Sequence, residues 1–480
     1  MKRSIFVLLI SLAFAGYTNA QNEVDALRYS QFYLNGTARS AAMGGAFGSL
    51  GADFTSLSIN PAGIGLYKAS EFTITPSVFT GKANSTYMGV ASEDLKYNFN
   101  LGNLGLVLAF TPKGSSGWKG VQFGMGVNRL NNFNNRIVME GYNAKNSLLD
   151  DYYNKAVGNA PADLDAFDTK LAFDLYLLDT LGGLTDYISA VPHGQTQQSK
   201  YIDRNGSINE MVLCLGGNYN DKLYIGGSLG FPFVRYFENS TYTEKDIHDS
   251  IPKFKQFSVK DDLETTGSGF NFKFGLIYRI TDWVRFGASV HTPTFYTMHD
   301  TYSRTMDAEF DTGKKEPSDS PKGKFDYELT TPLRANASLS FIISKFALIS
   351  ADYEFVDYSS ARLRSGTYKF YDENKAIDVK YTAQSNIRAG LEFRLAPVSL
   401  RVGGAYSTSP YRSSLNDGSR ISYSGGIGFR EKGYFIDLAY VYSKSGEDYY
   451  LYPSVPEASK VNYSNHNIML TLGVKFGGKN

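Results

Sequence analysis

Cysteine, tryptophan and net charge are nearly absent from this sequence. Of its 480 residues only Cys214 is a cysteine, which permits no internal disulfide bond and no cysteine-based metal cage. The 48 basic residues balance 47 acidic ones to a formal net charge of +1, which gives no reason to expect a nucleic-acid partner. Beyond the N-terminal region, no run of roughly 18 apolar residues could form a transmembrane helix.

Residues 1–20 have the composition of a secretory signal peptide. Two basic residues precede an apolar run over residues 5–15, and a small-residue cleavage site ends at Ala20. We therefore predict an exported chain whose mature part begins at Gln21. A lipid anchor on a mature N-terminal cysteine is excluded, because Cys214 lies far from the cleavage site.

Glycine, tyrosine and phenylalanine are abundant instead, with 47, 35 and 33 copies. Charged residues make up 20% of the chain, and the mean hydropathy is −0.27. An exported chain of this composition fits either a large secreted β protein or a transmembrane β-barrel. The modest charged fraction favours the barrel, because much of its outer surface faces lipid.

Strand periodicity separates these two solutions. In residues 270–280, 387–395 and 468–476, nearly every second side chain is aromatic or aliphatic, while the positions between are mostly glycine or polar. A barrel strand needs this alternation, since one face meets lipid and the other meets the lumen. Each apolar set therefore predicts a lipid-facing stripe.

The same alternation, bounded by turn residues, predicts fourteen strands in all. Long and short connections alternate between them, so all long loops lie on one side and both termini on the other. An even count with this asymmetry is what a bacterial outer-membrane barrel requires. The predicted strands lie at about 70–81, 98–111, 118–130, 207–219, 221–239, 260–280, 282–297, 325–343, 345–357, 378–395, 397–407, 420–431, 433–444 and 464–476.

The segment 37–67 differs from all of these strands. It is built of small residues and has too little apolar side-chain area to form a core of its own, so it should fold only inside something larger. Near its end stands Asn60-Pro61-Ala62-Gly63. Pro61 fixes φ and removes a backbone donor, while Gly63 allows positive φ, so we predict a rigid bend here.

The run RSAAMGGA at residues 39–46, followed by Asn60-Pro61-Ala62-Gly63, resembles the N-terminal hatch of the FadL family. That family comprises outer-membrane transporters of long-chain fatty acids and other hydrophobic compounds. Five further segments look like its recurring strand signatures in the same order. They are residues 290–294, 331–334, 351–358, 390–394 and 400–406.

The resemblance implies an all-β fold, a 14-stranded antiparallel transmembrane β-barrel. In it, residues 21–67 form a hatch inside the lumen and residues 68–480 form the barrel. It also implies that Asn60, Pro61, Ala62 and Gly63 form part of a gate. The expected location is the bacterial outer membrane, and the expected function is transport of hydrophobic small molecules. An alternative is a FadL-like barrel that binds, shuttles or anchors a secreted protein partner.

Two connections interrupt the strand pattern. Within residues 131–206, which we expect to be a long, partly helical extracellular loop, Leu164, Phe167, Leu171, Leu175 and Leu178 recur at helical spacing after Pro161. Such a helix would either pack on a neighbouring loop or receive ligand at the barrel mouth. Residues 298–324 are polar and predict a solvated external loop.

Charged side chains at lumen-facing positions are the remaining candidates. Arginine makes bidentate contacts to carboxylates, so the basic ones could meet a ligand head group, or they could pair with Glu392, Asp437 and Asp53 to hold the hatch. His291 also faces inward and is expected to be a hydrogen-bonded lumen residue. The candidate hatch or ligand contacts are Arg279, Arg285, His291, Arg334, Arg388 and Arg394, with Lys273 beside them.

The sequence offers little support for an enzyme. Residues 226–230 match G-x-S-x-G, but they lie within a predicted strand with no helix after it, so the turn that exposes a nucleophile is missing. No H-E-x-x-H motif occurs, and the five histidines lack metal-ligand spacing. We expect no catalytic residues, no metal and no cofactor. The expected partners are a hydrophobic small molecule and outer-membrane lipid.

Overall fold

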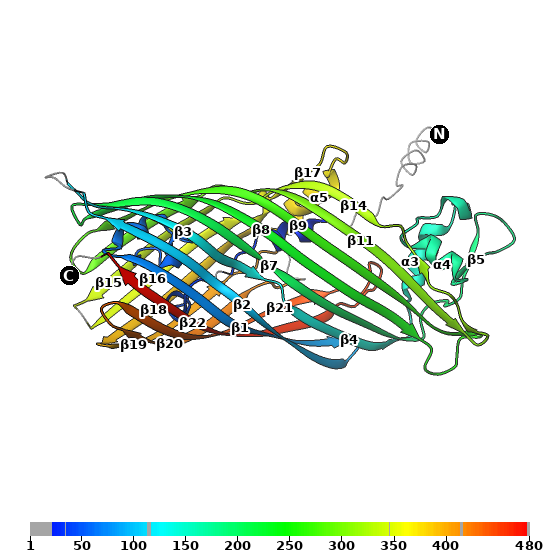
Figure 1. Ribbon diagram of the computed structural model, residues 1–480. Coiled ribbons are helices and arrows are strands. Elements are labelled where there is room, and N and C mark those ends of the chain that lie inside the picture. Colours follow the sequence, from blue (N-terminus) through cyan, green and yellow to red (C-terminus); the bar gives the residue numbers. More distant parts are fainter. Residues whose placement is uncertain (1–21, 34, 113–116, 345, 413–415, 478–480) are drawn as a thin grey trace, which may run out of the picture.

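The alternation in the sequence becomes a closed antiparallel barrel in the computed structural model, which describes residues 22–33, 35–112, 117–344, 346–412 and 416–477. The predicted signal peptide lies outside the described residues. The chain crosses the wall fourteen times, and its first strand pairs with its last (Figure 1). The predicted fold class is confirmed.

The wall and the elements attached to it have the following bounds. The wall strands are β1 (Ser70–Tyr87), β2 (Val90–Phe110), β3 (Trp118–Asn132), β4 (Asn135–Asn143), β7 (Thr196–Tyr219), β8 (Leu223–Lys245), β9 (Phe254–Arg279), β10 (Val284–His291), β11 (Phe295–Phe310), β14 (Gly323–Thr330), β15 (Arg334–Ile343), β16 (Ala347–Asp357), β18 (Ala383–Leu395), β19 (Val398–Ser407), β20 (Arg420–Arg430), β21 (Tyr434–Tyr449) and β22 (Ser459–Phe476). The smaller elements are α1 (Glu23–Ser30), α2 (Ala38–Ala42), η1 (Phe54–Ser58), η2 (Pro61–Leu66), α3 (Leu148–Ala156), η3 (Pro161–Asp163), α4 (Thr169–Asp174), β5 (Leu178–Thr180), β6 (Tyr187–Ser189), β12 (Gly313–Lys314), β13 (Ser318–Asp319), η4 (Tyr358–Ser360), β17 (Arg362–Arg364) and α5 (Tyr371–Lys380).

The outer face of the wall is apolar, as the alternation predicts. On β9 the side chains of Phe270, Phe272 and Phe274 are exposed, while Asn271 and Lys273 between them are buried. Short turns join the strands at one end and long loops at the other, which places the periplasm at the short-turn end. None of the helices in the described part of the chain is long and apolar enough to cross a membrane.

Two wall crossings are interrupted where continuous strands were predicted, and the third crossing continues beyond its predicted end at residue 130. The seventh is split at residues 292–294 and the eighth at residues 331–333, each around a proline. Pro293 and Pro332 cannot donate to the ladder, which explains both breaks. The third crossing is split between β3 and β4, at Phe133 and Asn134.

The wall also extends farther on the extracellular side than predicted. Residues 298–324 are not a solvated loop, because β11 continues to Phe310 alongside β9. The predicted loop 131–206 is shorter, because β4 pairs with the first part of β7. Strands beyond the membrane need no apolar outer face, so their alternation is too weak to detect.

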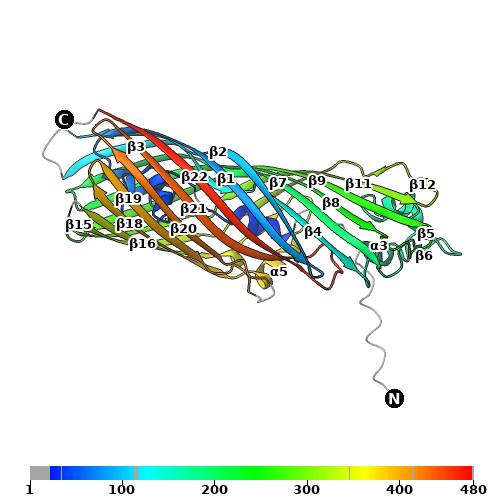
Figure 2. The ribbon, with the colours of Figure 1, turned by 90° about the horizontal axis from the view of Figure 1, so that it is seen from below.

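Residues 22–33 and 35–67 lie inside the barrel and are hereafter called the hatch segment (Figures 1 and 2). Most of this segment is buried. Inward-facing glycines make room for it: a Cβ atom at Gly226 would collide with the Pro61 backbone, and one at Gly390 would collide with Met43. The glycines of the lumen face thus let a wide segment fit against the wall.

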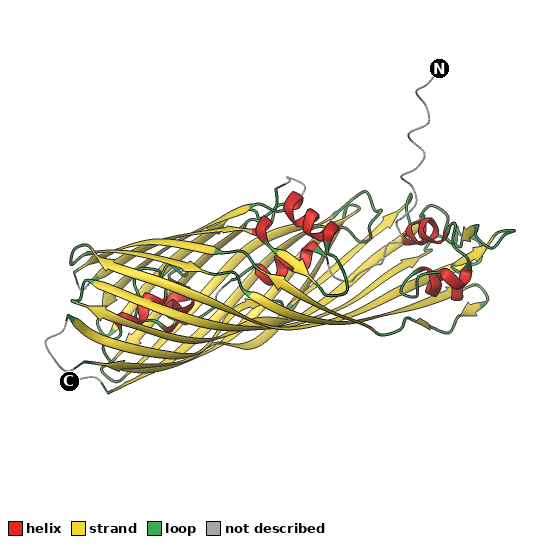
Figure 3. Cartoon of the chain, turned by 90° about the horizontal axis from the view of Figure 1, so that it is seen from above, coloured by secondary structure: helices red, strands yellow, loops and turns green. Residues whose placement is uncertain are grey.

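The long loop after β4 forms a packed cap over the extracellular end (Figure 3). The single helix predicted after Pro161 is wrong: the segment forms the turn η3 and the short helix α4, and Leu178 begins β5. Its leucines Leu164, Leu171, Leu175 and Leu178 are nevertheless buried in one cluster with barrel side chains. Their spacing marks a shared core rather than one helix face.

Candidate functional site

The bend at Asn60-Pro61-Ala62-Gly63 is held by the side chain of Asn60. Its Oδ1 accepts a hydrogen bond from the Ala62 backbone nitrogen (3.1 Å), which caps η2 with Pro61 as its first residue. Its Nδ2 donates to the backbone carbonyls of Gly48 (2.6 Å) and Leu276 (3.0 Å). One amide thus joins two parts of the hatch segment to strand β9, which is chemistry that alanine cannot provide.

Side chains of the barrel wall also form hydrogen bonds with Ile59, the residue before this bend. The carbonyl of Ile59 accepts from the Ser289 hydroxyl (2.8 Å) and lies 2.7 Å from Nε2 of His291. Because a carbonyl can only accept, the His291 ring must carry its proton on Nε2. His291 is therefore a hydrogen-bonded lumen residue that contacts the hatch segment.

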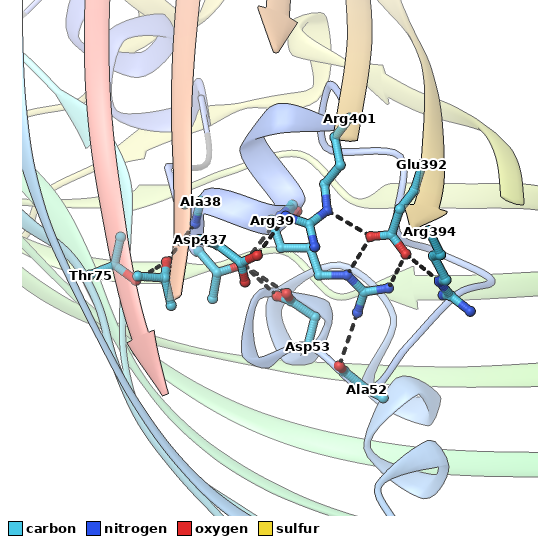
Figure 4. A network of polar contacts seen from close by, with 12 residues as sticks. Ala38, Arg39, Ala52, Asp53, Thr75, Glu392, Arg394, Arg401 and Asp437 are labelled. Carbon is cyan, nitrogen blue, oxygen red and sulfur yellow. Dashed lines mark hydrogen bonds and ion pairs between the residues drawn. The ribbon is translucent and has the colours of Figure 1, made fainter. Parts of the chain in front are cut away.

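A cluster of buried charges fixes α2 to the opposite wall (Figure 4). Glu392 of β18 accepts from Arg39 of the hatch segment (3.0 Å), Arg401 of β19 (2.7 Å) and Arg394 (2.7 Å). Arg401 continues the cluster to Asp437 of β21 (2.5 Å). Charge-assisted bonds of this kind are strong and directional, so the cluster holds the hatch segment in one place.

Sequence reasoning found only part of this cluster. It predicted that Glu392 and Asp437 face inward and hold the hatch, and the structure places both in the cluster. It missed Arg39, although that residue lies within the hatch motif, and Arg401, whose inward position follows from the alternation in β19. Among the described residues Asp53 forms no ion pair with an arginine; it accepts from the Thr37 hydroxyl (2.7 Å) and caps η1.

Other predicted lumen residues surround a cavity of about 160 Å³ above the bend. Glu354 pairs with Arg334 (2.9 Å) and with Arg388 (3.3 Å). Arg420 lies over the Tyr33 ring, 4.1 Å from its centroid, and donates to Ser443 (2.7 Å). The cavity lining includes Lys273, His291, Arg334, Glu354, Arg388 and Arg420.

The remaining candidates lie apart from this cavity. Arg279 pairs with Asp282 (2.8 Å) in a periplasmic turn, and Arg285 donates to the Leu50 carbonyl (3.3 Å). Arg394 belongs to the Glu392 cluster. Lys273, which does line the cavity, pairs with Glu210 (2.5 Å), a partner that sequence reasoning missed.

A second cavity, of about 380 Å³, opens at the extracellular end beneath α3. Its lining combines aromatic side chains such as Tyr152 and Tyr242 with charged ones. Arg304 crosses it, binding Asp261 (2.5 Å) and the Phe167 carbonyl (3.2 Å). The cap and the wall are thus joined around a space at the barrel mouth.

The wall itself is discontinuous at the level of this cavity. The ladder between β2 and β3 ends at the pair Asn103 and Asn128, so among the described strands residues 90–102 of β2 form a backbone ladder with β1 alone. Above the split, β4 pairs with β7, and Val138 accepts from the Ser85 hydroxyl of β1. We call this missing stretch of ladder the lateral break.

Several contacts span the lateral break, among them a hydrogen bond from the Arg129 side chain to the Leu101 carbonyl (3.2 Å). From β2, Lys96 pairs with Asp203 of β7 and donates to Asn205 (2.6 Å). Lower down, the hatch segment takes the place of β2: the Tyr33 nitrogen donates to the Leu130 carbonyl (2.7 Å), and the Asn35 nitrogen to the Arg129 carbonyl (3.2 Å). Movement of the hatch segment would therefore free the backbone of β3 at the break.

The rest of the described chain provides no obvious catalytic or metal site. Ser228 of the G-x-S-x-G match lies in the middle of β8, not on a strand-to-helix turn. No cluster of three or more histidine, cysteine or acidic side chains in the described residues could hold a metal ion.

Comparison with known proteins supports the fold. No family model and no curated protein matches the chain. Among solved structures, the toluene transporter TodX of Pseudomonas putida has a TM-score of 0.55 at 14% identity, covering 94% of this chain and 100% of that chain. A Pseudomonas aeruginosa FadL homologue gives 0.54 at 12%, covering 93% and 99%. The CymD monoaromatic hydrocarbon channel gives 0.52 at 13%, covering 92% and 97%. The chain thus has the FadL-type barrel fold.

Proposed function

We propose that this protein resides in the bacterial outer membrane and transports hydrophobic small molecules across it. The observation that carries the proposal is the lateral break in an otherwise closed barrel whose axis is filled by the hatch segment. A hydrophobic solute leaves water for any apolar surface, so a plugged barrel with a side exit suits it better than an open watery pore. The solved structures of this fold include transporters and channels for such compounds.

The route begins in the extracellular cavity. Lys200 lines this cavity and stands in register with Met139 of β4, which places the cavity and the lateral break at the same level. Helix α1 lies at the break as well, because the ring of Tyr29 packs against Phe133 at 6.1 Å. A solute in the cavity thus leaves sideways into lipid when α1 and the chain after it shift. In this proposal Asn60, Pro61, Ala62 and Gly63 keep the axial route shut.

Proteoliposomes test the transport itself. The full mature chain should accelerate uptake of a labelled aromatic hydrocarbon or fatty acid over protein-free vesicles. A hydrophilic sugar of similar size should enter no faster than it enters protein-free vesicles, because the hatch segment fills the lumen. Equal rates for the sugar would indicate an open pore, and no acceleration of any hydrophobe would refute transport.

The lumen arginines divide into two groups in this account. Arg334, Arg388 and Arg394 already bind carboxylates of the wall, so we assign them to holding the structure. Arg420 has no carboxylate within ion-pair distance among the described residues, and it borders the 160 Å³ cavity. We assign Arg420 to meeting the acid group of a ligand that carries one.

This assignment predicts a charge-selective effect of Arg420→Gln. Uptake or binding of a fatty acid should weaken about tenfold, the equivalent of roughly 1.4 kcal/mol, because a charged hydrogen bond is lost. Its methyl ester, which has no charge, is the control and should be unaffected. Equal losses for acid and ester would assign Arg420 to structure alone.

One observation favours the alternative, a binding role toward a secreted protein. The β5–β6 hairpin carries Leu181 and Leu184 at its tip, 61% and 73% exposed. Exposed leucines this far from the membrane can serve a protein interface. If Leu181→Ser with Leu184→Ser leaves hydrocarbon uptake intact but abolishes binding of a defined secreted partner, the hairpin serves that second role.

A further inference from the structure

A groove of about 930 Å³ lies on the outer wall near the periplasmic end. Gly217 of β7 and Gly227 of β8 stand at outward-facing positions, in register with Ile225 and Leu215 respectively. A Cβ atom at Gly217 would collide with the Trp118 ring, so Trp118 covers that glycine, whereas Gly227 leaves a trough beside the Phe272 ring. The apolar lining includes Trp118, Val121, Phe123, Leu213, Phe272 and Phe274.

The wall beneath this groove is a single backbone thick. The adjacent positions Gly216 and Gly226 face inward and pair with one another. A Cβ atom at Gly216 would collide with Ile64, and one at Gly226 with the Pro61 backbone. The hatch bend therefore rests on the inner side of the wall segment whose outer side forms the groove.

The periplasmic edge of the groove is aromatic and positively charged. The rings of Trp118 and Tyr219 pack edge to face at 5.5 Å, an arrangement typical of the membrane interface. Lys119 and Lys222 are exposed beside them, and neither side chain has an ion-pair partner among the described residues. The nearby carboxylate of Asp221 is engaged by the Asn218 amide (2.6 Å).

The groove spans the depth of one lipid leaflet. From Tyr219 to Leu213 the strand advances six residues at about 3.4 Å each, or roughly 20 Å along its own axis. Because a barrel strand is tilted by about 40° from the membrane normal, this length covers roughly 15 Å of membrane depth. The hydrocarbon core of a bilayer is about 30 Å thick, so one leaflet contributes half of that. An acyl chain that starts at the edge would lie along the whole groove.

We propose that this groove is a binding site for a phospholipid of the periplasmic leaflet. One acyl chain lies over Gly227, beside the ring of Trp118, and the phosphate is held by Lys119 and Lys222. The acyl chain fills the trough over Gly227, and the two cations complement the anionic head group. The bound lipid supports the thin wall segment against which the hatch bend packs.

Native mass spectrometry of the full mature chain in detergent, titrated with dioleoyl phosphatidylglycerol, tests the site. Gly227→Leu fills the trough; a Cβ there meets nothing closer than the Phe272 ring, at an ordinary 3.4 Å, so the variant should fold. Gly425→Leu is the matched control. Gly425 faces outward on β20, far along the wall from the groove, and its Cβ would meet nothing closer than 3.7 Å. A heat-shift on a gel checks that both variants form barrels.

We expect the unaltered chain to retain one lipid, Gly227→Leu to bind it about tenfold more weakly, and Gly425→Leu to bind it normally. Lys119→Glu with Lys222→Glu should weaken phosphatidylglycerol about tenfold as well. Equal retention by the two glycine variants would overturn the site. Displacement of the lipid by dodecane at equal concentration would also overturn the proposal, because the groove would then bind any hydrophobic solute rather than a phospholipid.

Discussion

At the scale of single residues, Glu392 is the junction between hatch segment and wall. Three guanidinium groups converge on its carboxylate, and its side chain is 2% exposed. Removing one partner of a buried ion pair leaves the others uncompensated, which costs more than the pair contributes. Glu392 thus controls how firmly α2 is held.

Glu392→Ala should therefore loosen the hatch segment by about 3–5 kcal/mol, while the barrel stays closed. Hydrogen exchange over α2 should rise, and the heat-shift of the barrel on a gel should remain. Glu309→Ala, on an extracellular strand, is a control that should alter neither. Unchanged exchange at α2 in Glu392→Ala would show that other contacts hold the segment.

A second residue-scale effect concerns Asp25 of α1. Burial raises its pKa from 3.8 to about 7, against the opposing effect of Arg28. A carboxyl with a raised pKa binds its proton more tightly in the packed state than when released. Packing of α1 should therefore weaken as the pH rises from about 3.8 through about 7, and this group should add no further pH dependence above that.

Hydrogen exchange of α1 at pH 5 and pH 8, corrected for intrinsic exchange rates, measures this effect. The difference in protection should be roughly that caused by one titrating group. Protection should be greater at the lower pH. Asp25→Asn removes the titration and should make protection independent of pH. A pH dependence that survives in this variant would assign it to another group.

At the scale of elements, the sequence specifies the strands better than their interruptions. The lipid-facing stripes of β9, β18 and β22 follow from simple alternation, because a strand in a membrane must keep its outer face apolar. The third strand was predicted to end at residue 130, just before the run NNFNN at residues 131–135, which is rich in turn-forming asparagine. Its continuation as β4 beyond that run was missed. The cap was misread because its leucines serve a core built from several elements.

The bend η2 is the element most sensitive to side-chain size. Ala62 is fully buried against Tyr224 and Ile277, with the glycines of β8 behind it. Ala62→Leu should overpack this contact by about 1–3 kcal/mol and displace the hatch segment, so solute uptake should change while the barrel remains heat-shifted. Ala337→Leu, at an exposed, outward-facing position of β15, is the control. Loss of the barrel in Ala62→Leu would instead make the bend a folding element.

At the scale of the whole molecule, the hatch segment fills the interior of the barrel, and the wall lacks ladder hydrogen bonds between β2 and β3 at the lateral break. Fourteen strands leave a lumen too wide to be filled by wall side chains alone, so a separate segment must occupy it. The sequence predicted that segment, its bend and several inward charges. Arg39, Arg401, Glu210 and Glu354 were missed as partners, because pairing across the lumen depends on strand positions that alternation alone does not give.

Uptake through a barrel whose lateral break has been cross-linked tests lateral release of the solute most directly. In a Cys214→Ala background, Lys96→Cys with Asp203→Cys joins β2 to β7 across the break through a reducible bismaleimide. Leu106→Cys with Met125→Cys, on the intact part of the β2–β3 ladder, is the control. We predict that the first cross-link lowers hydrocarbon uptake at least about tenfold, that reduction restores it, and that the control has no effect. Undiminished uptake with the break cross-linked would contradict lateral release.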